Sequence, residues 1–431
     1  MNKKKNILFS VLLVSFILVG VFVGRKTASN EFYDNSNPKQ IKEENTLSMM
    51  IEQTAGTGDY KMEERSSWPT EGYKFNATLS KCANGGELSW DDTNKVINMT
   101  GNMSDKCYIY FDIFALTDYV KLLYTGTQGE NSIYYHDNTL ENGAGDNSYR
   151  YAGASDVVNN YVCFGYDGTD ACPTDNLYRI IGVFDNQVKL IKATAASSSL
   201  LGTDGVYVSE TAYRLSSLDS CPSETAYINE NGIIVLSNKN IIALPWDIDY
   251  EVRGCNKWNI SELNTINLNT NYLNNIGESW SSKIAETTWK VGGNTYDTIY
   301  AAVPKTAYTN EITNPVADTT YDAKIGLIYV SDYYYAASSN NWSLVGYNSS
   351  DATADYRAAT TSNWMYLGSN EWTITPLSSN EKYVFIIYSS GYVTSYKTKS
   401  STASVRPVFY LDSLIKYMSG SGISSDPIVI E

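Results

Sequence analysis

Short alternating runs of apolar and polar residues recur along the chain after residue 71, and they predict β-strands joined by tight turns. Residues 71–113 hold four such runs, YKFNATL, GELSWD, KVINMT and CYIYFDI, separated by turn sequences such as ANGG and DDTN. In the last run Tyr108 and Tyr110 alternate with Ile109 and Phe111, as in a half-buried strand. We therefore expect a small all-β module over residues 71–113.

Residues 126–431 combine hairpin patterns with one helical region. Residues 178–193 and 383–396 each hold two apolar runs around a short turn. Further strands are predicted at 325–331 and 404–411, a connecting helix at 114–125, and two helices within 258–289. Antiparallel hairpins around a two-helix segment indicate an α+β domain and not a parallel α/β fold.

The N-terminus predicts export. Lys3, Lys4 and Lys5 precede an uncharged apolar stretch at 7–24, which is long enough for a helix that spans a bilayer. A cleaved signal peptide is the alternative, but no A-x-A cleavage site follows the stretch. We favour an uncleaved, single-pass anchor with the C-terminal part extracellular. The protein would be secreted if the segment is cleaved.

Composition narrows the function. The chain carries 32 basic and 47 acidic residues, a net charge of −15, so binding to nucleic acid is not expected. Residues 1–26 hold five of the basic residues and none of the acidic ones, which leaves the exported part at −20. His136 is the one histidine in the sequence, which argues against most catalytic triads and histidine metal sites. No cofactor and no metal are expected.

The six cysteines all follow the apolar stretch and suit an oxidising compartment. Six cysteines allow fifteen pairings, and sequence alone does not choose among them. Proximity in the chain suggests the pairs Cys82–Cys107, Cys163–Cys172 and Cys221–Cys255.

Several segments resemble a known type of surface protein. YKFNATLSKCANGGELSWDD and SDKCYIYFD resemble a small module on exported proteins of Gram-positive gut-type bacteria. NLYRIIGVFDNQVKLIKA, IGLIYVSDYYYAA, NWMYLGSNEWTITP and SVRPVFYL resemble an uncharacterised domain family found beside that module. That domain is similar to the C-type-lectin-like fold of formylglycine-generating enzymes and phage receptor-binding variable proteins. The resemblance covers roughly residues 46–431 and implies a fold and a surface location, not an activity.

Two departures from the better-known relatives matter. No cysteine follows Cys255, whereas formylglycine-generating enzymes use cysteines late in the domain. The EPN, QPD and WND motifs of calcium-dependent sugar-binding lectins do not occur either. The resemblance therefore implies neither that enzyme chemistry nor calcium-dependent sugar binding at the usual place.

The expected organisation is an α+β, C-type-lectin-like domain behind a small β module and an N-terminal transmembrane helix. Its parts are a cytoplasmic N-terminus 1–6, a transmembrane signal-anchor 7–24, a stalk 25–70, the β module 71–113, a connecting helix 114–125 and the large domain 126–431.

Aromatic residues gather in the stretch 333–366, among many Ser, Asn, Ala and Thr residues. Tyrosine and tryptophan give large, stiff contact areas, and Ser and Asn supply adaptable hydrogen bonds. A ligand surface and a simple role in the core are both open. The candidate ligand-binding residues are Tyr333, Tyr334, Tyr335, Trp342, Tyr347, Tyr356, Arg357, Trp364 and Tyr366.

Other candidate sites are weaker. Ser379 and Lys382 match S-x-x-K, but they stand where a turn is expected. His136 beside Asp137 suits a loop histidine with local hydrogen bonds better than an acid–base pair. Asp137, Glu141 and Asp146 lack the spacing of a calcium loop. Arg406 is expected to form a structural ion pair.

The sequence thus favours a non-enzymatic, membrane-anchored extracellular protein that binds a glycan or a protein. An extracellular enzyme based on paired carboxylates and a structural surface protein are the alternatives.

Overall fold

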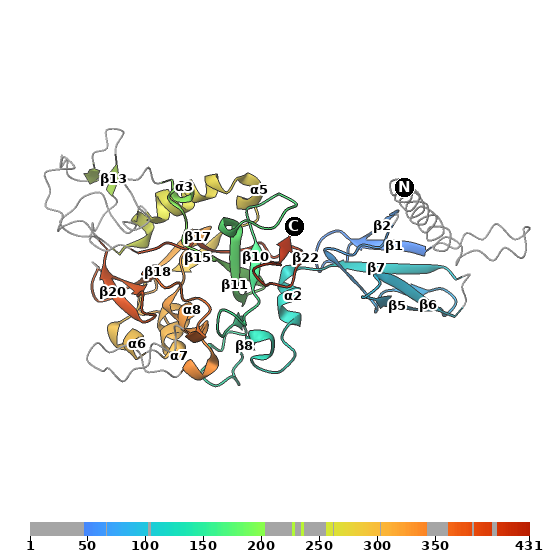
Figure 1. Ribbon diagram of the computed structural model, residues 1–431, viewed down its shortest axis with the longest axis horizontal. Helices are drawn as coiled ribbons and strands as arrows, with labels where there is room; N and C mark the ends of the chain where they lie inside the picture. Colours follow the sequence, from blue (N-terminus) through green and yellow to red (C-terminus); the bar gives the residue numbers. More distant parts are fainter. Residues whose placement is uncertain are drawn as a thin grey trace, which may run out of the picture. The chain divides into compact units, whose positions relative to one another are not determined.

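The computed structural model describes residues 47–65, 67–101, 105–202, 226–228, 234–236, 256–261, 263–301, 303–342, 361–381, 383–398 and 403–431. The chain divides into two compact units, residues 1–113 and 114–431 (Figure 1). It is a mixed α and β protein, mostly sheet with short helices, so the α+β prediction is confirmed at that level. None of the helices in the described ranges is long and apolar enough to cross a membrane, and the segment 7–24 lies outside these ranges.

The small unit is built on a five-stranded sheet in which β1 runs parallel to β7. The strand order is β2-β1-β7-β3, with β4 also paired to β7, and a separate β5–β6 hairpin packs Trp90 edge-on against Phe111. Met49, Ile51, Ile109 and Phe111 form the buried core. The strands are β1 Leu47–Glu52, β2 Tyr60–Glu63, β3 Tyr73–Phe75, β4 Lys81–Cys82, β5 Glu87–Asp91, β6 Val96–Thr100 and β7 Cys107–Ile113.

The prediction of a stalk is wrong for residues 47–63, which form the strands β1 and β2 of this sheet and the loop between them. Met49 and Ile51 alternate into the core, and the Glu52 carboxylate accepts the backbone N–H of Ile113 at 2.9 Å. The strand β1 is thus stabilised by partners about sixty residues away, which a local reading of a polar segment cannot reveal.

The large unit is centred on a seven-stranded sheet with the order β17-β21-β12-β11-β9-β8, and β10 also pairs with β11. The predicted hairpin at 178–193 is confirmed as β11 and β12. Its turn residues Asp185 and Asn186 both have positive φ, 44° and 65°, as the central residues of a two-residue type I′ hairpin loop require. The strands are β8 Ile133–Tyr135, β9 Tyr149–Tyr151, β10 Tyr161–Cys163, β11 Leu177–Phe184, β12 Gln187–Lys192, β17 Ile325–Gly326 and β21 Val408–Tyr410.

A three-stranded antiparallel sheet, β18-β19-β20, contains the second predicted hairpin. The helices α6 (Tyr296–Tyr300) and α8 (Val330–Tyr335) pack beside it (Figure 1). Its strands are β18 Glu371–Pro376, β19 Tyr383–Ile387 and β20 Val393–Lys397. The remaining strand pairs are β13 Ala226–Ile228 with β14 Ile234–Leu236, β15 Thr287–Lys290 with β16 Thr320–Ala323, and β22 Tyr417–Ser419 with β23 Val429–Ile430.

The helices are short. The α-helices are α2 Leu116–Leu122, α3 Ser198–Leu201, α4 Leu273–Asn275, α5 Glu278–Ser281, α6 Tyr296–Tyr300, α7 Pro304–Tyr308 and α8 Val330–Tyr335. The 3₁₀ turns are η1 Glu130–Ser132, η2 Thr174–Asn176, η4 Trp258–Ile260 and η7 Ser339–Asn341, and the π-helical segments are η5 Leu263–Tyr272 and η6 Thr309–Thr313.

Two local predictions are wrong. The helical part of 258–289 ends at Ser281, and Trp289 lies in β15, where its indole N–H donates to the Ala323 carbonyl at 3.0 Å. The expected strand at 325–331 pairs only over Ile325–Gly326, and the chain then enters α8 at Val330. In both places a buried apolar run is compatible with helix or strand, and tertiary pairing decides.

Two of the three expected disulfides are confirmed. Cys82 is bonded to Cys107 in the small unit, and Cys163 is bonded to Cys172 in the large unit. Cys221 and Cys255 lie outside the described residues.

Candidate functional site

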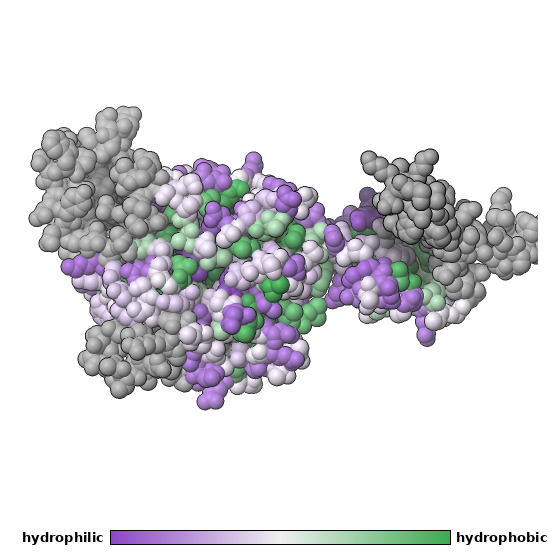
Figure 2. Space-filling model, in the orientation of Figure 1, coloured by the Kyte–Doolittle hydropathy of each residue, from purple (hydrophilic) through white to green (hydrophobic). Residues whose placement is uncertain are grey.

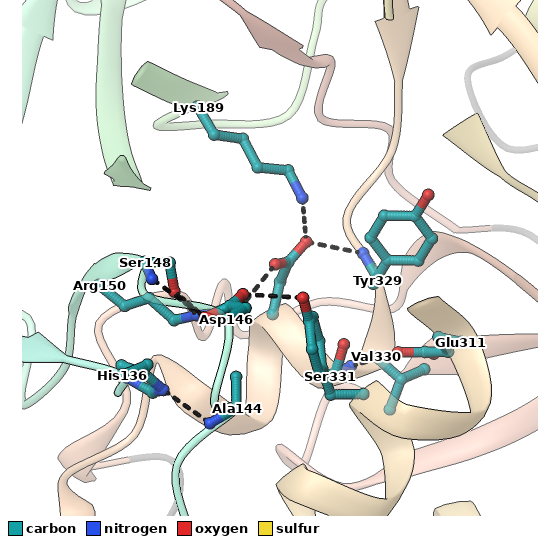
Figure 3. A network of polar contacts seen from close by, with 12 residues as sticks. His136, Ala144, Asp146, Ser148, Arg150, Lys189, Glu311, Tyr329, Val330 and Ser331 are labelled. Carbon is teal, nitrogen blue, oxygen red and sulfur yellow. Dashed lines mark hydrogen bonds and ion pairs between the residues drawn. The ribbon is translucent and has the colours of Figure 1, made fainter. Parts of the chain in front are cut away.

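Three charged side chains are buried together between the central sheet and α8, and a fourth, Asp146, is largely covered beside them (Figure 3). Arg150 on β9 and Lys189 on β12 come from neighbouring parts of the sheet, and each is only 1% exposed. They meet Asp332 in the first turn of α8, which is 3% exposed, and Asp146 in the loop before β9. Charges this deeply buried require partners, and the network supplies them.

Asp332 is the centre of the network. Its Oδ2 lies 2.5 Å from Lys189 Nζ and accepts the backbone N–H of Tyr329 at 3.1 Å. Its Oδ1 lies 3.7 Å from Nη1 of Arg150. The same carboxylate therefore caps the N-terminus of α8 and joins the helix to two strands of the sheet.

Asp146 holds the other side of Arg150. Its Oδ2 lies 2.6 Å from Arg150 Nη2 and accepts the Tyr308 hydroxyl at 2.8 Å. The guanidinium also faces aromatic rings, with its carbon 4.6 Å from the Phe184 centroid and 4.9 Å from that of Tyr308. Arg150 is thereby fixed by charge and by ring contacts together.

The surroundings lower the pKa values of both Asp146 and Lys189, for different reasons. Burial alone would raise the pKa of Asp146, but attraction to Arg150 and hydrogen bonds from Ser148 and Tyr308 outweigh it and hold that pKa well below its usual range. Burial lowers the pKa of Lys189, and attraction to Asp332 opposes the shift.

Glu311 behaves in the opposite way. Burial raises its pKa to about 7, although hydrogen bonds from Ser331 and Thr375 favour the charged form. Its two carboxylate oxygens accept the backbone N–H of Ser331 at 3.1 Å and the Thr375 hydroxyl at 2.6 Å.

A cavity of about 120 Å³ adjoins the network. It has room for a few water molecules, at about 30 Å³ of liquid volume each. Two carboxylates on its wall lie within ion-pair distance of a cation: Asp146 at 2.6 Å from Arg150, and Asp332 at 2.5 Å from Lys189. The lining residues are Asp146, Ser148, Phe184, Asp185, Lys189, Tyr308, Ile312, Tyr329, Ser331, Asp332 and Tyr410.

His136 is a loop residue with a local hydrogen bond, as expected, but it is fully buried. Its Nδ1 accepts the Ala144 N–H at 3.1 Å, and its ring packs against Tyr335 and Trp342. Burial holds its pKa well below the usual value, so the ring is neutral. The adjacent Asp137 instead accepts the N–H and hydroxyl groups of Thr139.

Of the two roles that the sequence leaves open for the aromatic residues, the core role fits Tyr333, Tyr335, Trp342 and Trp364, which are buried. Their polar atoms bond to the backbone: Tyr333 to Gly391, Tyr335 to Asn142, Trp342 to Ala337 and Trp364 to Tyr151. Tyr334 and Tyr366 are half-buried, and Tyr347, Tyr356 and Arg357 lie outside the described residues. The helix α8 carries Tyr333 and Tyr335 into the core, and Trp342 and Trp364 are buried from the segments that follow it.

A different set of tyrosines reaches the surface at the β19–β20 hairpin. Tyr388, Tyr392 and Tyr396, here called the tyrosine row, are half-buried. The rings of Tyr388 and Tyr392 stack at 4.8 Å between centroids, and Tyr396 lies 6.2 Å from Tyr388. Small hydroxyl residues lie next to the row in sequence: Ser389, Ser390, Thr394 and Ser395. Figure 2 shows the visible surface over β20 in pale shades, between strongly hydrophilic and strongly hydrophobic.

Arg406 forms the structural ion pair that was expected. Its Nε and Nη2 donate to the two Glu371 carboxylate oxygens, both at 2.7 Å, and Nη2 also donates to the Met365 carbonyl. Among the residues that the structure describes, no cluster of three or more His, Cys, Asp or Glu side chains is arranged to hold a metal. Ser379 lies in the turn between β18 and β19, and Lys382 is not among the described residues.

Comparison with known protein families, characterised proteins and solved structures gives no match. The buried network therefore has to be interpreted from its own residues. The site residues predicted from the sequence did not include Arg150, Lys189, Asp332 and Glu311. A signal was present, since Lys189 stands inside the apolar strand VKLIK, where a charge needs a buried partner.

Proposed function

We propose that the chain is a membrane-anchored extracellular surface protein that binds a glycan or a protein through the tyrosine row. The segment 7–24 after three lysines supports the anchor, and the two disulfides fit an oxidising compartment. The antiparallel hairpins around a helical segment support the proposed C-type-lectin-like fold of the large unit. The buried core positions of Tyr333, Tyr335, Trp342 and Trp364 move the proposed site from the 333–366 stretch to the hairpin.

One observation carries the proposal: the half-exposed rings of Tyr388 and Tyr392 stack in the turn between β19 and the edge strand β20, and Tyr396 follows on β20. Tyrosine supplies a broad apolar face and a hydroxyl while losing little side-chain entropy on binding. Such a face suits the ring of a sugar or an exposed patch of a protein partner.

A binding screen of residues 29–431 tests the proposal, with mucin glycans, bacterial envelope polysaccharides and matrix proteins as probes. Each probe is measured with and without a calcium chelator. Replacing Tyr388 and Tyr396 together by alanine is expected to weaken a specific hit at least about tenfold, as loss of a central aromatic contact does.

Tyr108→Ala is the matched control, because Tyr108 is 43% exposed on the small unit. Equal binding by the double variant and the control would reject the tyrosine row as the site. Loss of binding on chelation would instead point to a calcium site.

A further inference from the structure

Lys189 and Asp332 are placed as reactants rather than only as an ion pair. The Nζ of Lys189 lies 2.5 Å from Oδ2 of Asp332, and both side chains are almost completely buried. Lys189 is held in the middle of the hairpin by pairing of β12 with β11 and β21. Asp332 is held in the first turn of α8 by its bond from the Tyr329 N–H. Reactive groups fixed this closely have most of the entropy of their encounter already removed.

We propose that Lys189 and Asp332 condense to an intramolecular amide, which covalently joins β12 to α8. The lysine nitrogen forms a bond to Cγ of Asp332, and the bond from Cγ to one carboxylate oxygen breaks. An ammonium and a carboxylate give an amide and one water, so the step requires no outside proton, oxidant or reductant.

The surroundings favour each stage. Proton transfer from the ammonium to the carboxylate leaves a neutral amine and a neutral acid, and a buried, low-dielectric site favours this neutral pair. The ring centroids of Tyr329, Phe184, Tyr410 and Trp289 lie 4.9, 5.4, 5.4 and 5.8 Å from Nζ. These rings limit the access of bulk water and so protect the amide once it has formed.

Arg150 and the cavity complete the arrangement. Arg150 Nη1 lies 3.7 Å from Asp332 Oδ1 and makes no hydrogen bond, so it can stabilise negative charge that develops on that oxygen. Lys189 and Asp332 both line the cavity, which gives the released water a place to go.

The other ion pairs in the described part of the chain lack this combination. Arg65, Arg150 and Arg406 carry guanidinium groups, which are always protonated and therefore poor nucleophiles. Lys95–Asp92, Lys290–Asp318 and Lys416–Glu431 are exposed to water. Lys192 is buried, but its Nζ bonds to the Asp175 carbonyl and the Thr194 hydroxyl, neither of which is a carboxyl group.

Peptide mapping of the full-length chain, after reduction of the disulfides and digestion, tests the proposal. We expect the peptides that contain Lys189 and Asp332 to appear joined, about 18 Da (one water) lighter than their sum. Lys189→Arg, which keeps the positive charge, should abolish the joined species. Lys192→Arg, in the same strand, should retain it.

Asp332→Asn is a second variant that preserves the shape of the site. It should give the same joined product with loss of ammonia, about 17 Da. Separate peptides of full mass from the folded wild-type chain would overturn the proposal. So would a loss of water that maps to another residue, or a joined species that persists in Lys189→Arg.

Discussion

Several charged side chains of the large unit are buried at positions where apolar side chains are usual, and each is stabilised by its own polar partners. Glu371 is 1% exposed, and both of its oxygens bond to Arg406. Arg179 is held differently, by neutral acceptors such as Asn160 Oδ1 at 2.6 Å and by the rings of Tyr161 and Trp364. Burial lowers the pKa of Arg179 to about 10, and nearby Arg406 adds to the shift while Tyr161 opposes it. Removal of one partner from such a site leaves the other desolvated and unpaired.

Arg406→Ala is accordingly expected to lower the free energy of unfolding by about 3–5 kcal/mol, the range for a broken buried pair. Chemical denaturation followed by tryptophan fluorescence measures the change. The control is Lys290→Ala, which removes a pair with Asp318 in which the two side chains are 32% and 76% exposed. That variant should lose less than about 1 kcal/mol. Equal losses in both variants would contradict the structural role of Arg406.

Glu311 makes stability depend on pH near neutrality. Its pKa rises from 4.5 to about 7 in the folded chain, mainly through burial. Between these values the folded state holds more protons than the unfolded state, so the free energy of unfolding falls as pH rises. The fall should approach about 3 kcal/mol, since each pKa unit corresponds to about 1.4 kcal/mol.

The variant Glu311→Gln should flatten this dependence, since glutamine does not titrate. Denaturation at several pH values between 4.5 and 8 gives the two slopes. The difference between wild type and variant is the quantity to compare, because other groups titrate in both. An identical slope in the two proteins would show that Glu311 does not carry the effect.

At the scale of elements, β7 is the strand on which the small unit is assembled. It pairs with β1, β3 and β4, and the Cys82–Cys107 disulfide joins it to β4. The bridge closes a loop with a sequence separation of 25 residues. Its main effect is to limit the freedom of the unfolded chain.

Replacing Cys82 and Cys107 by alanine should cost about 3 kcal/mol by the loop-entropy model. Faster amide hydrogen exchange in Cys107–Ile113 would report the loss at the strand itself. The matched control is the double alanine variant of Cys163 and Cys172, a bridge in the large unit, which should leave exchange in β7 unchanged. If both variants change β7 equally, the effect is not local to the bridge.

For the whole molecule, the proposed anchor makes the location of the chain depend on its first residues. The full chain is expected to fractionate with membranes and to resist extraction by high salt or alkali. A chain that begins at residue 29 should leave the membrane fraction. Sequencing the N-terminus of the mature protein then decides between anchor and signal peptide, since an intact residue 7–24 segment supports the anchor and its loss supports cleavage.

Much of the fold follows from local sequence. The hairpins around Asp185-Asn186 and Ser390-Gly391 are visible because turn chemistry and apolar alternation lie within about fifteen residues. Proximity in the chain suggests the Cys82–Cys107 and Cys163–Cys172 pairs without excluding other pairings. Arg406 was expected in an ion pair because a guanidinium in an apolar segment needs polar partners, although Arg179 meets the same need with neutral acceptors.

Other features were decided only by the tertiary structure, because they depend on contacts between residues that are far apart in the sequence. Strand β1 is fixed by β7 some sixty residues later, and the pair Lys189–Asp332 has a sequence separation of 143. Whether a tyrosine faces solvent or core depends on how its element packs, so Tyr333 is buried while Tyr388 is half-exposed. By itself the sequence determined the hairpins and the mixed α and β class, because these depend on neighbours along the chain, and proximity suggested the two disulfides that the structure confirms. The buried charge network and the surface tyrosines were decided only by folding, because burial is a property of the packed molecule.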